Sequence, residues 1–200
     1  LDDPMFMTLN QQIVMAHYNQ YWGMATEVLR FAFSDAPHDA PFVAEFAIGT
    51  DDEPLTVYAT IGMSDLPMPE AGPIERVELF MYANECRDEL REALALLAIY
   101  PFQNHSPLAP LDTIYGSRGL VGDSRLTSVL LTFPLREPEE FAAVDVGEYT
   151  VHLLNVTPIT EDERQLCVAH GSLTLLTRFA REGVDVANLR RASVEGREPP

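Results

Sequence analysis

The chain has 200 residues, of which 46% are hydrophobic, and its 31 acidic and 13 basic side chains give a net charge of −18. This length and apolar content are sufficient for one folded domain with its own core. The charge excludes nucleic acid and anionic membrane as favourable partners, because an acidic surface repels phosphate groups, and it favours a basic protein partner.

Hydrophobic periodicity and turn residues divide the chain into helices and strands. The predicted helices cover residues 8–22, 87–99, 160 to about 169, and 172–182. The predicted strands cover residues 25–33, 42–48, 55–62, 75–83, a short piece near 111–115, 126–133 and 149–157. This order lacks the strict strand–helix alternation of a dinucleotide-binding fold. We therefore predict an α/β domain of the α+β type, with a mixed, largely antiparallel sheet flanked by helices.

Two neighbouring strands show the clearest alternation of apolar and polar residues. Residues 55–62 place Leu55, Val57, Ala59 and Ile61 on one side, and residues 75–83 place Val77, Leu79 and Met81 on one side, with Glu78, Phe80 and Tyr82 on the other. Such alternation predicts half-buried strands. The proline-containing loop between them predicts that the two strands pair antiparallel.

The helix ends are marked by specific residues. Pro101 is expected to end the 87–99 helix, because proline has no backbone N–H to donate. In that helix Arg91 and Glu92 are expected to lie mostly outside the apolar stripe. Thr160 and Glu163 have the spacing of a capping box, which predicts a helix start.

We predict one domain over residues 1–182 and a weakly structured tail over residues 183–200. Acidic residues concentrate in the body of the chain. Residues 35–92 hold 14 Asp or Glu against three Arg, a local net charge of −11. A basic partner is expected to meet this region first.

Motifs for catalysis or metal binding are missing. All 13 basic residues are arginine, which removes lysine Schiff-base chemistry and the P-loop lysine. The five histidines are scattered, and Cys86 and Cys167 form no metal motif, so we predict no metal and no cofactor. Two reduced thiols, with neither a signal-peptide pattern nor a run of 18 apolar residues, predict a cytoplasmic protein.

A hydrolase is the alternative from a different functional class. Residues 62–66 (GMSDL) partly match the nucleophile turn of hydrolases, in which small residues flank the serine. Leu66 stands where the second glycine is needed, and a Ser-Asp turn after a strand explains the same residues. The alternative places an unrecognised site near Ser64, Asp65 and His105.

Several phrases in a fixed order resemble the Suppressor-of-fused domain family. They are residues 61–68 (IGMSDLPM), 76–82 (RVELFMY), 94–102 (LALLAIYPF) and 151–160 (VHLLNVTPIT), the last followed by Glu163. The order agrees over about residues 20–180. The resemblance implies an α/β domain without known enzymatic activity. Eukaryotic relatives are two-lobed clamps on a transcription-factor peptide, partly by strand addition, whereas bacterial relatives are stand-alone domains, some associated with toxin–immunity systems.

These observations lead to the hypothesis of a non-enzymatic protein-binding domain, in its most specific form a bacterial immunity protein that neutralises a basic toxin. The predicted partner contacts are Asp65, Glu70, Glu75 and Glu78, which lie within the acidic stretch 50–92. A regulatory domain of a larger assembly is a further alternative. A homodimer through a shared sheet edge also remains open.

Overall fold

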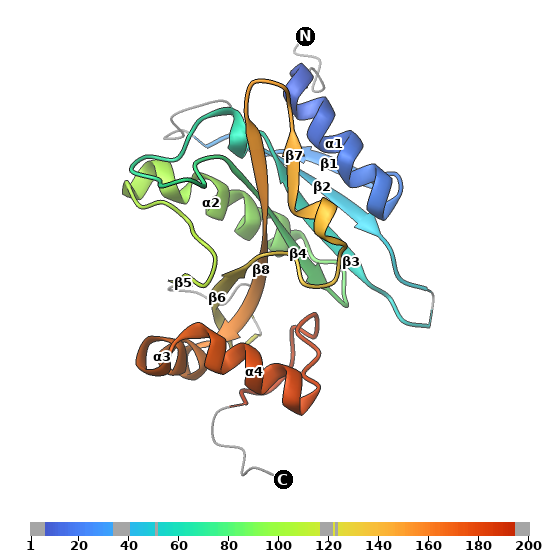
Figure 1. The fold of residues 1–200 in the computed structure, drawn as a ribbon. Coiled ribbons are helices and arrows are strands. Elements are labelled where there is room, and N and C mark those ends of the chain that lie inside the picture. The colour runs from blue at the N-terminus through green and yellow to red at the C-terminus, as the bar shows by residue number, and fades with distance from the viewer. Residues whose placement is uncertain (1–6, 34–40, 51, 117–121, 123, 195–200) are drawn as a thin grey trace.

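The computed structural model describes residues 7–33, 41–50, 52–116, 122 and 124–194. Its helices are α1 (Leu9–Trp22), α2 (Asp88–Asn104), α3 (Glu161–His170) and α4 (Ser172–Glu182), with two short 3-10 helices, η1 (Met63–Asp65) and η2 (Glu139–Ala142). Its strands are β1 (Glu27–Arg30), β2 (Phe42–Ala47), β3 (Thr56–Ile61), β4 (Val77–Ala83), β5 (Thr113–Tyr115), β6 (Leu126–Thr132), β7 (Ala143–Asp145) and β8 (Thr150–Thr160). Figure 1 shows these elements in their arrangement.

The eight strands form one mixed sheet in the order β1-β2-β3-β4-β8-β6-β5, and β7 pairs with β8 beside this path. Neighbouring strands are antiparallel except β4 and β8, which are parallel. The predicted fold class and the predicted antiparallel pairing of β3 with β4 are both confirmed. Strand β8 joins the two parts of the sheet, because it pairs with β4, β6 and β7.

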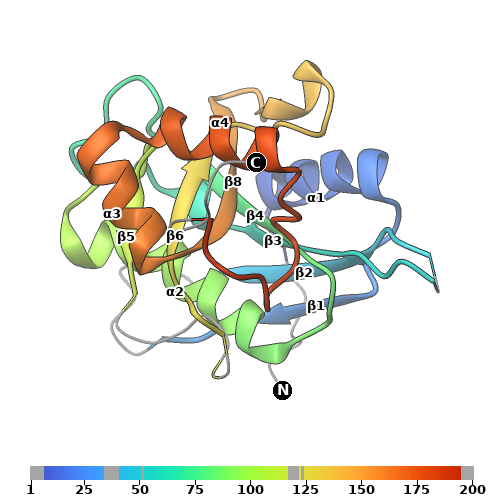
Figure 2. The same cartoon turned by 90° about the horizontal axis from the view of Figure 1, so that it is seen from below.

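Helices cover the sheet on both faces. Helices α1 and α2 lie on opposite sides of it, and α3 and α4 lie together near one end of β8 (Figures 1 and 2). Aromatic side chains of α1, including Tyr18 and Trp22, pack with Phe80 on one face. Leucines of α2, including Leu90 and Leu94, pack with the residues that point to the other face.

Strands β3 and β4 are therefore buried along their whole length, where the sequence predicted half-buried strands. The polar positions of the alternation do not face water. Tyr58, for example, is fully buried under α2, and its hydroxyl accepts a hydrogen bond from the backbone N–H of Arg87 at 2.8 Å. Period-two alternation separates the two faces of a strand, but it does not show whether the more polar face is exposed. A helix can cover that face if the polar groups of the strand find hydrogen-bond partners.

Two local expectations are wrong. Pro101 lies inside α2, and the helix continues to Asn104 before His105 adopts a left-handed conformation with φ of 49°. Pro101 itself is buried and Phe102 packs on the α2 core, so burial offsets the lost backbone hydrogen bond. Arg91 is also not outside the apolar stripe, because it is 6% exposed and forms ion pairs with carboxylates on β1 and β2.

The capping box at the start of α3 is confirmed, and it has a further role. The Thr160 hydroxyl accepts from the Glu163 N–H at 3.3 Å, and the Glu163 carboxylate accepts from the Thr160 N–H at 2.9 Å. The same buried carboxylate accepts two hydrogen bonds from the Arg191 guanidinium, at 2.7 and 2.8 Å, and one from the N–H of Val194.

This contact anchors the C-terminal segment, residues 184–194. The segment has no helix or strand, but its side chains enter all three hydrophobic clusters of the protein, through Ala187, Leu189 and Val194. The expectation of weak structure from residue 183 onward therefore does not describe residues 184–194. The remainder of that predicted tail, 195–200, lies outside the described residues.

Replacing Arg191 by methionine is expected to destabilise the protein by about 3–5 kcal/mol, because it leaves the fully buried Glu163 without its counter-charge. Urea unfolding of both proteins measures this change. Arg190→Met is the matched control, since the Arg190 side chain is 67% exposed beside Glu85 and its loss should cost less than about 1 kcal/mol. Equal losses at the two positions contradict the anchoring role.

Candidate functional site

The four acidic residues predicted to contact a partner do not lie in equivalent environments. Asp65, Glu70 and Glu75 belong to the loop between β3 and β4, where Glu70 and Glu75 are exposed and Asp65 is half-buried. Glu78 is fully buried on β4. The sequence pattern places Glu78 on the same strand face as Phe80 and Tyr82, and α1 covers that face, so the Glu78 carboxylate is not available at the surface.

Glu78 instead holds the turn that follows β3. Its carboxylate accepts hydrogen bonds from the Thr60 hydroxyl at 2.6 Å, the Gly62 N–H at 2.8 Å, and both the N–H and the hydroxyl of Ser64 at 3.0 and 2.7 Å. Gly62 has φ of 102°, and a Cβ atom there would lie 2.9 Å from the Gln11 amide nitrogen. The turn therefore requires glycine at position 62 and a buried acceptor at position 78.

The same turn positions the exposed loop. The Arg76 guanidinium donates to the carbonyl oxygens of Ser64 and Asp65 at 2.7 and 2.8 Å and stacks on the Tyr149 ring at 3.9 Å. The Asp65 carboxylate accepts from the Gln11 side chain at 2.6 Å. Asp65 is thus committed to an internal contact, whereas Glu70 and Glu75 remain exposed. Their role as partner contacts stays a prediction.

The residues of the hydrolase alternative are not arranged as a nucleophile and base. Ser64 is 3% exposed, and its hydroxyl donates to Glu78. The Asp65 carboxylate is bound by Gln11, and His105 follows the C-terminus of α2. A nucleophile must be accessible to substrate and must face its base. Among the described residues no group of His, Cys, Asp or Glu could hold a metal ion either.

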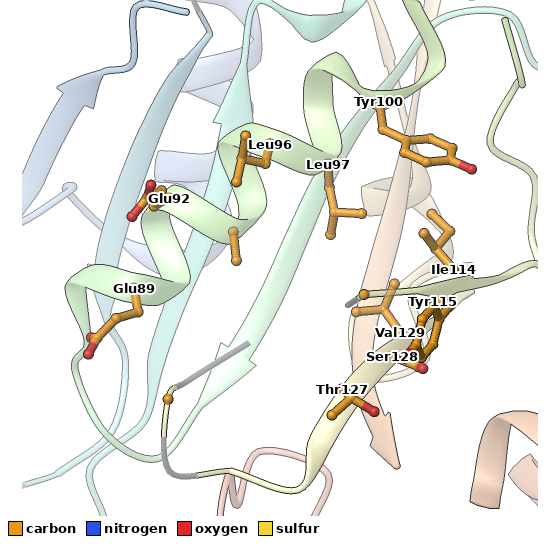
Figure 3. Close-up of a pocket in the computed structure, with 13 residues that line it drawn as sticks. Glu89, Glu92, Leu96, Leu97, Tyr100, Ile114, Tyr115, Thr127, Ser128 and Val129 are labelled. Carbon is orange, nitrogen blue, oxygen red and sulfur yellow. The ribbon is translucent and has the colours of Figure 1, made fainter. Parts of the chain in front are cut away.

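A surface depression lies elsewhere, between α2 and the edge of the sheet. This α2–β5 groove has a volume of about 440 Å³, with α2 as one wall and strands β5 and β6 opposite (Figure 3). Its apolar lining includes Leu96, Leu97, Ile114 and Val129. Leu96 is 46% exposed, so an apolar side chain of α2 faces the groove rather than the core.

Strand β5 forms the outer border of this region and ends the main strand order of the sheet at the side opposite β1. The Gly116 N–H donates to Thr127, and the Asp112 carbonyl accepts from Leu131, so these two residues turn their backbone toward β6. The alternation of antiparallel pairs then directs the backbone groups of Thr113 and Tyr115 outward. A second hollow of about 400 Å³ also borders β5.

The opposite edge of the sheet differs in character. Strand β1 carries Glu27 and Arg30, and Glu27 forms an ion pair at 2.6 Å with Arg91 of α2. Charged side chains on an edge strand disfavour pairing with another chain. Strand β5 has no charged residue, and its Tyr115 is 58% exposed. The edge at β5 is therefore the more suitable of the two for an added strand.

The groove was not predicted from the sequence. Glu92 lies outside the apolar stripe as predicted, but Leu96 and Tyr100 follow it on the same side of the helix. Apolar residues at i+4 and i+8 from an exposed glutamate, off the core stripe, are the local pattern that indicates a second contact surface.

The fold is that of a mixed α+β domain of the Suppressor-of-fused class. The chain shares its fold with a putative Suppressor-of-fused homologue from Neisseria gonorrhoeae, at 21% identity and a TM-score of 0.76, over 94% of this chain and 98% of that one. It is also similar to a chain of a Sufu–Fu complex, at 16% identity and a TM-score of 0.72, over 92% of each. Drosophila Suppressor of Fused matches at 18% identity and a TM-score of 0.64, over 92% of this chain and 50% of that one.

The family model of the Suppressor of fused protein (SUFU) matches residues 39–192, and the chain belongs to this family. The resemblance inferred from the ordered phrases is thereby confirmed. No curated protein matches the chain. Among the described residues no helix is long and apolar enough to cross a membrane.

Glu78 gives a pH-dependent prediction. Burial raises its pKa above the usual 4.5, against the opposing effect of the hydrogen bonds from Thr60, Ser64 and Gly62. The folded state therefore binds this proton more tightly than the unfolded state, and the contribution to stability grows as the pH falls from neutrality to about 4.5. Glu78→Gln lacks this contribution. The stability of wild type minus that of Glu78→Gln, from urea unfolding at several pH values, should rise as the pH is lowered; a flat difference contradicts it.

Proposed function

We propose that this protein is a non-enzymatic protein-binding domain that captures a basic partner at the β5 edge of its sheet. The observation that carries the proposal is the combination of an uncharged edge strand with an apolar groove beside it. A segment that adds to a sheet edge gains main-chain hydrogen bonds, and pockets beside the edge select its side chains.

The charge supports a basic partner. The net charge of the chain is −18. The acidic region 35–92, with 14 acidic residues against three arginines, includes the start of α2 as far as Glu92, and α2 forms one wall of the groove. Opposite charges accelerate association and suppress unsuitable partners. Pairing of a second copy at the same edge would bring −18 against −18, so a homodimer receives no support from the charge.

The role of an immunity protein that neutralises a basic toxin is the specific form of this proposal. It draws support from the acidity and from the lack of a recognised catalytic motif in the sequence. An immunity protein blocks its toxin by direct, tight binding. Opposite charges on the two proteins raise the rate at which they associate. A partner that inhibits growth when expressed alone, and is harmless when this chain is co-expressed, would support this role.

Replacing Thr113 by proline is expected to weaken partner binding at least about 10-fold, because proline removes an outward N–H from β5 and places its ring on the strand edge. Affinity capture from the native host at low salt supplies the partner, and binding of the purified partner is then measured by biosensor across salt concentrations. The association rate of wild type should fall as salt rises.

Thr113→Val is the matched control, because it keeps the backbone N–H and is expected to bind as wild type does. Circular dichroism and thermal unfolding of both variants verify that they are folded. Failure to recover any partner at low salt argues against the proposed function. Recovery of a partner that binds the proline variant equally well moves the site away from β5.

A further inference from the structure

The α2–β5 groove has two chemically distinct parts. Leu96, Leu97, Ile114 and Val129 form an apolar part, and Glu89 and Glu92 line the end toward the N-terminus of α2 (Figure 3). Both glutamates are exposed, and within the described part of the chain neither carboxylate has an ion-pair partner. The groove therefore offers an apolar surface for a hydrophobic side chain and, next to it, two carboxylates for a cationic one.

Other charges of α2 are already used. Asp88 pairs with Arg91, and Arg91 in turn is bound by Glu27 and Glu45. These ion pairs hold Arg91, the arginine of α2, on the side of the helix away from the groove, where the three carboxylates neutralise its charge. The groove side of α2 consequently presents negative charge without a neighbouring arginine of its own helix.

The spacing along α2 sets the spacing of the partner's side chains. Glu92 precedes Leu96 by four residues, and Glu89 precedes it by seven, which corresponds to about 6 and 10 Å along a helix at 1.5 Å per residue. In an extended chain the side chains on one face are about 6.7 Å apart. An apolar side chain at Leu96 thus places the next same-face side chain near Glu92, and the one after it within reach of Glu89.

We infer that the α2–β5 groove selects an extended peptide segment with an apolar side chain at one position and Arg or Lys two and four positions from it. This inference rests on the proposed function and specifies its partner. The apolar side chain packs between Leu96 and Val129, and the cations pair with Glu92 and Glu89. Long cationic side chains suit this arrangement, because their aliphatic stems can lie on the apolar part while the charge reaches the carboxylates.

The experiment uses a phage-displayed library of random dodecapeptides, selected on the immobilised full chain at low salt. Three proteins are compared: wild type, the Glu89→Gln/Glu92→Gln double variant, and a Glu139→Gln/Glu140→Gln control. The control removes the same charge from η2, whose two glutamates are exposed and do not line the groove. Enriched peptides are then synthesised and their Kd values measured against all three proteins.

Wild type and the control are expected to enrich peptides with the apolar and basic residues in the alternating spacing, and the groove variant is expected to bind them about 10-fold more weakly, since two exposed ion pairs at several-fold each are lost. Enrichment of peptides without a basic preference, or an equal loss in the control, overturns this inference but leaves the proposed function intact. Peptides that bind the Glu89→Gln/Glu92→Gln variant as tightly as wild type, but do not bind Thr113→Pro, would show that the β5 edge binds them without the groove, which also overturns this inference. No enrichment on any protein overturns the proposed function as well.

Discussion

The structure depends on burial of both faces of a single sheet. Most polar groups on the central strands must then find a partner inside the protein, because little of either face is left to water. Two glutamates meet this requirement in different ways. Glu78 is satisfied by neutral donors and fixes a turn, whereas Glu163 is satisfied by an arginine from the end of the described chain and closes the fold. The rim of the sheet and the exposed side of α2 carry polar and apolar groups that this internal pairing does not use.

Much of the fold could be predicted from local patterns. Alternation located β3 and β4, the capping box located the start of α3, and the ordered phrases indicated the family. The errors share one cause, namely that a local pattern does not reveal what lies on the other side of an element. Glu78 alternates as an outward residue would, and Arg91 has the position of a solvated one, yet α1 and the carboxylates of β1 and β2 enclose them.

The candidate site was harder to predict than the fold, for a related reason. The groove joins α2 to β5 and β6, which are separated along the chain by an irregular stretch, and a sequence pattern does not show that they face each other. The composition showed that the chain is acidic, but it did not show which carboxylates are bound by neighbouring side chains and which are exposed. Asp65 and Asp88 are engaged by neighbouring groups, whereas Glu89 and Glu92 border an apolar surface.

The position of β8 in the sheet has a consequence for synthesis on the ribosome. Strand β4 ends at Ala83, and its parallel neighbour β8 begins only at Thr150, so the middle of the sheet stays open while more than sixty intervening residues are made. During that interval the nascent chain exposes an apolar strand edge that no later element yet covers. The C-terminal segment that enters all three clusters emerges last of the described chain. The fold of the described residues can therefore be completed only after residues 184–194 have been made, and until β8 follows, β4 presents an unpaired edge.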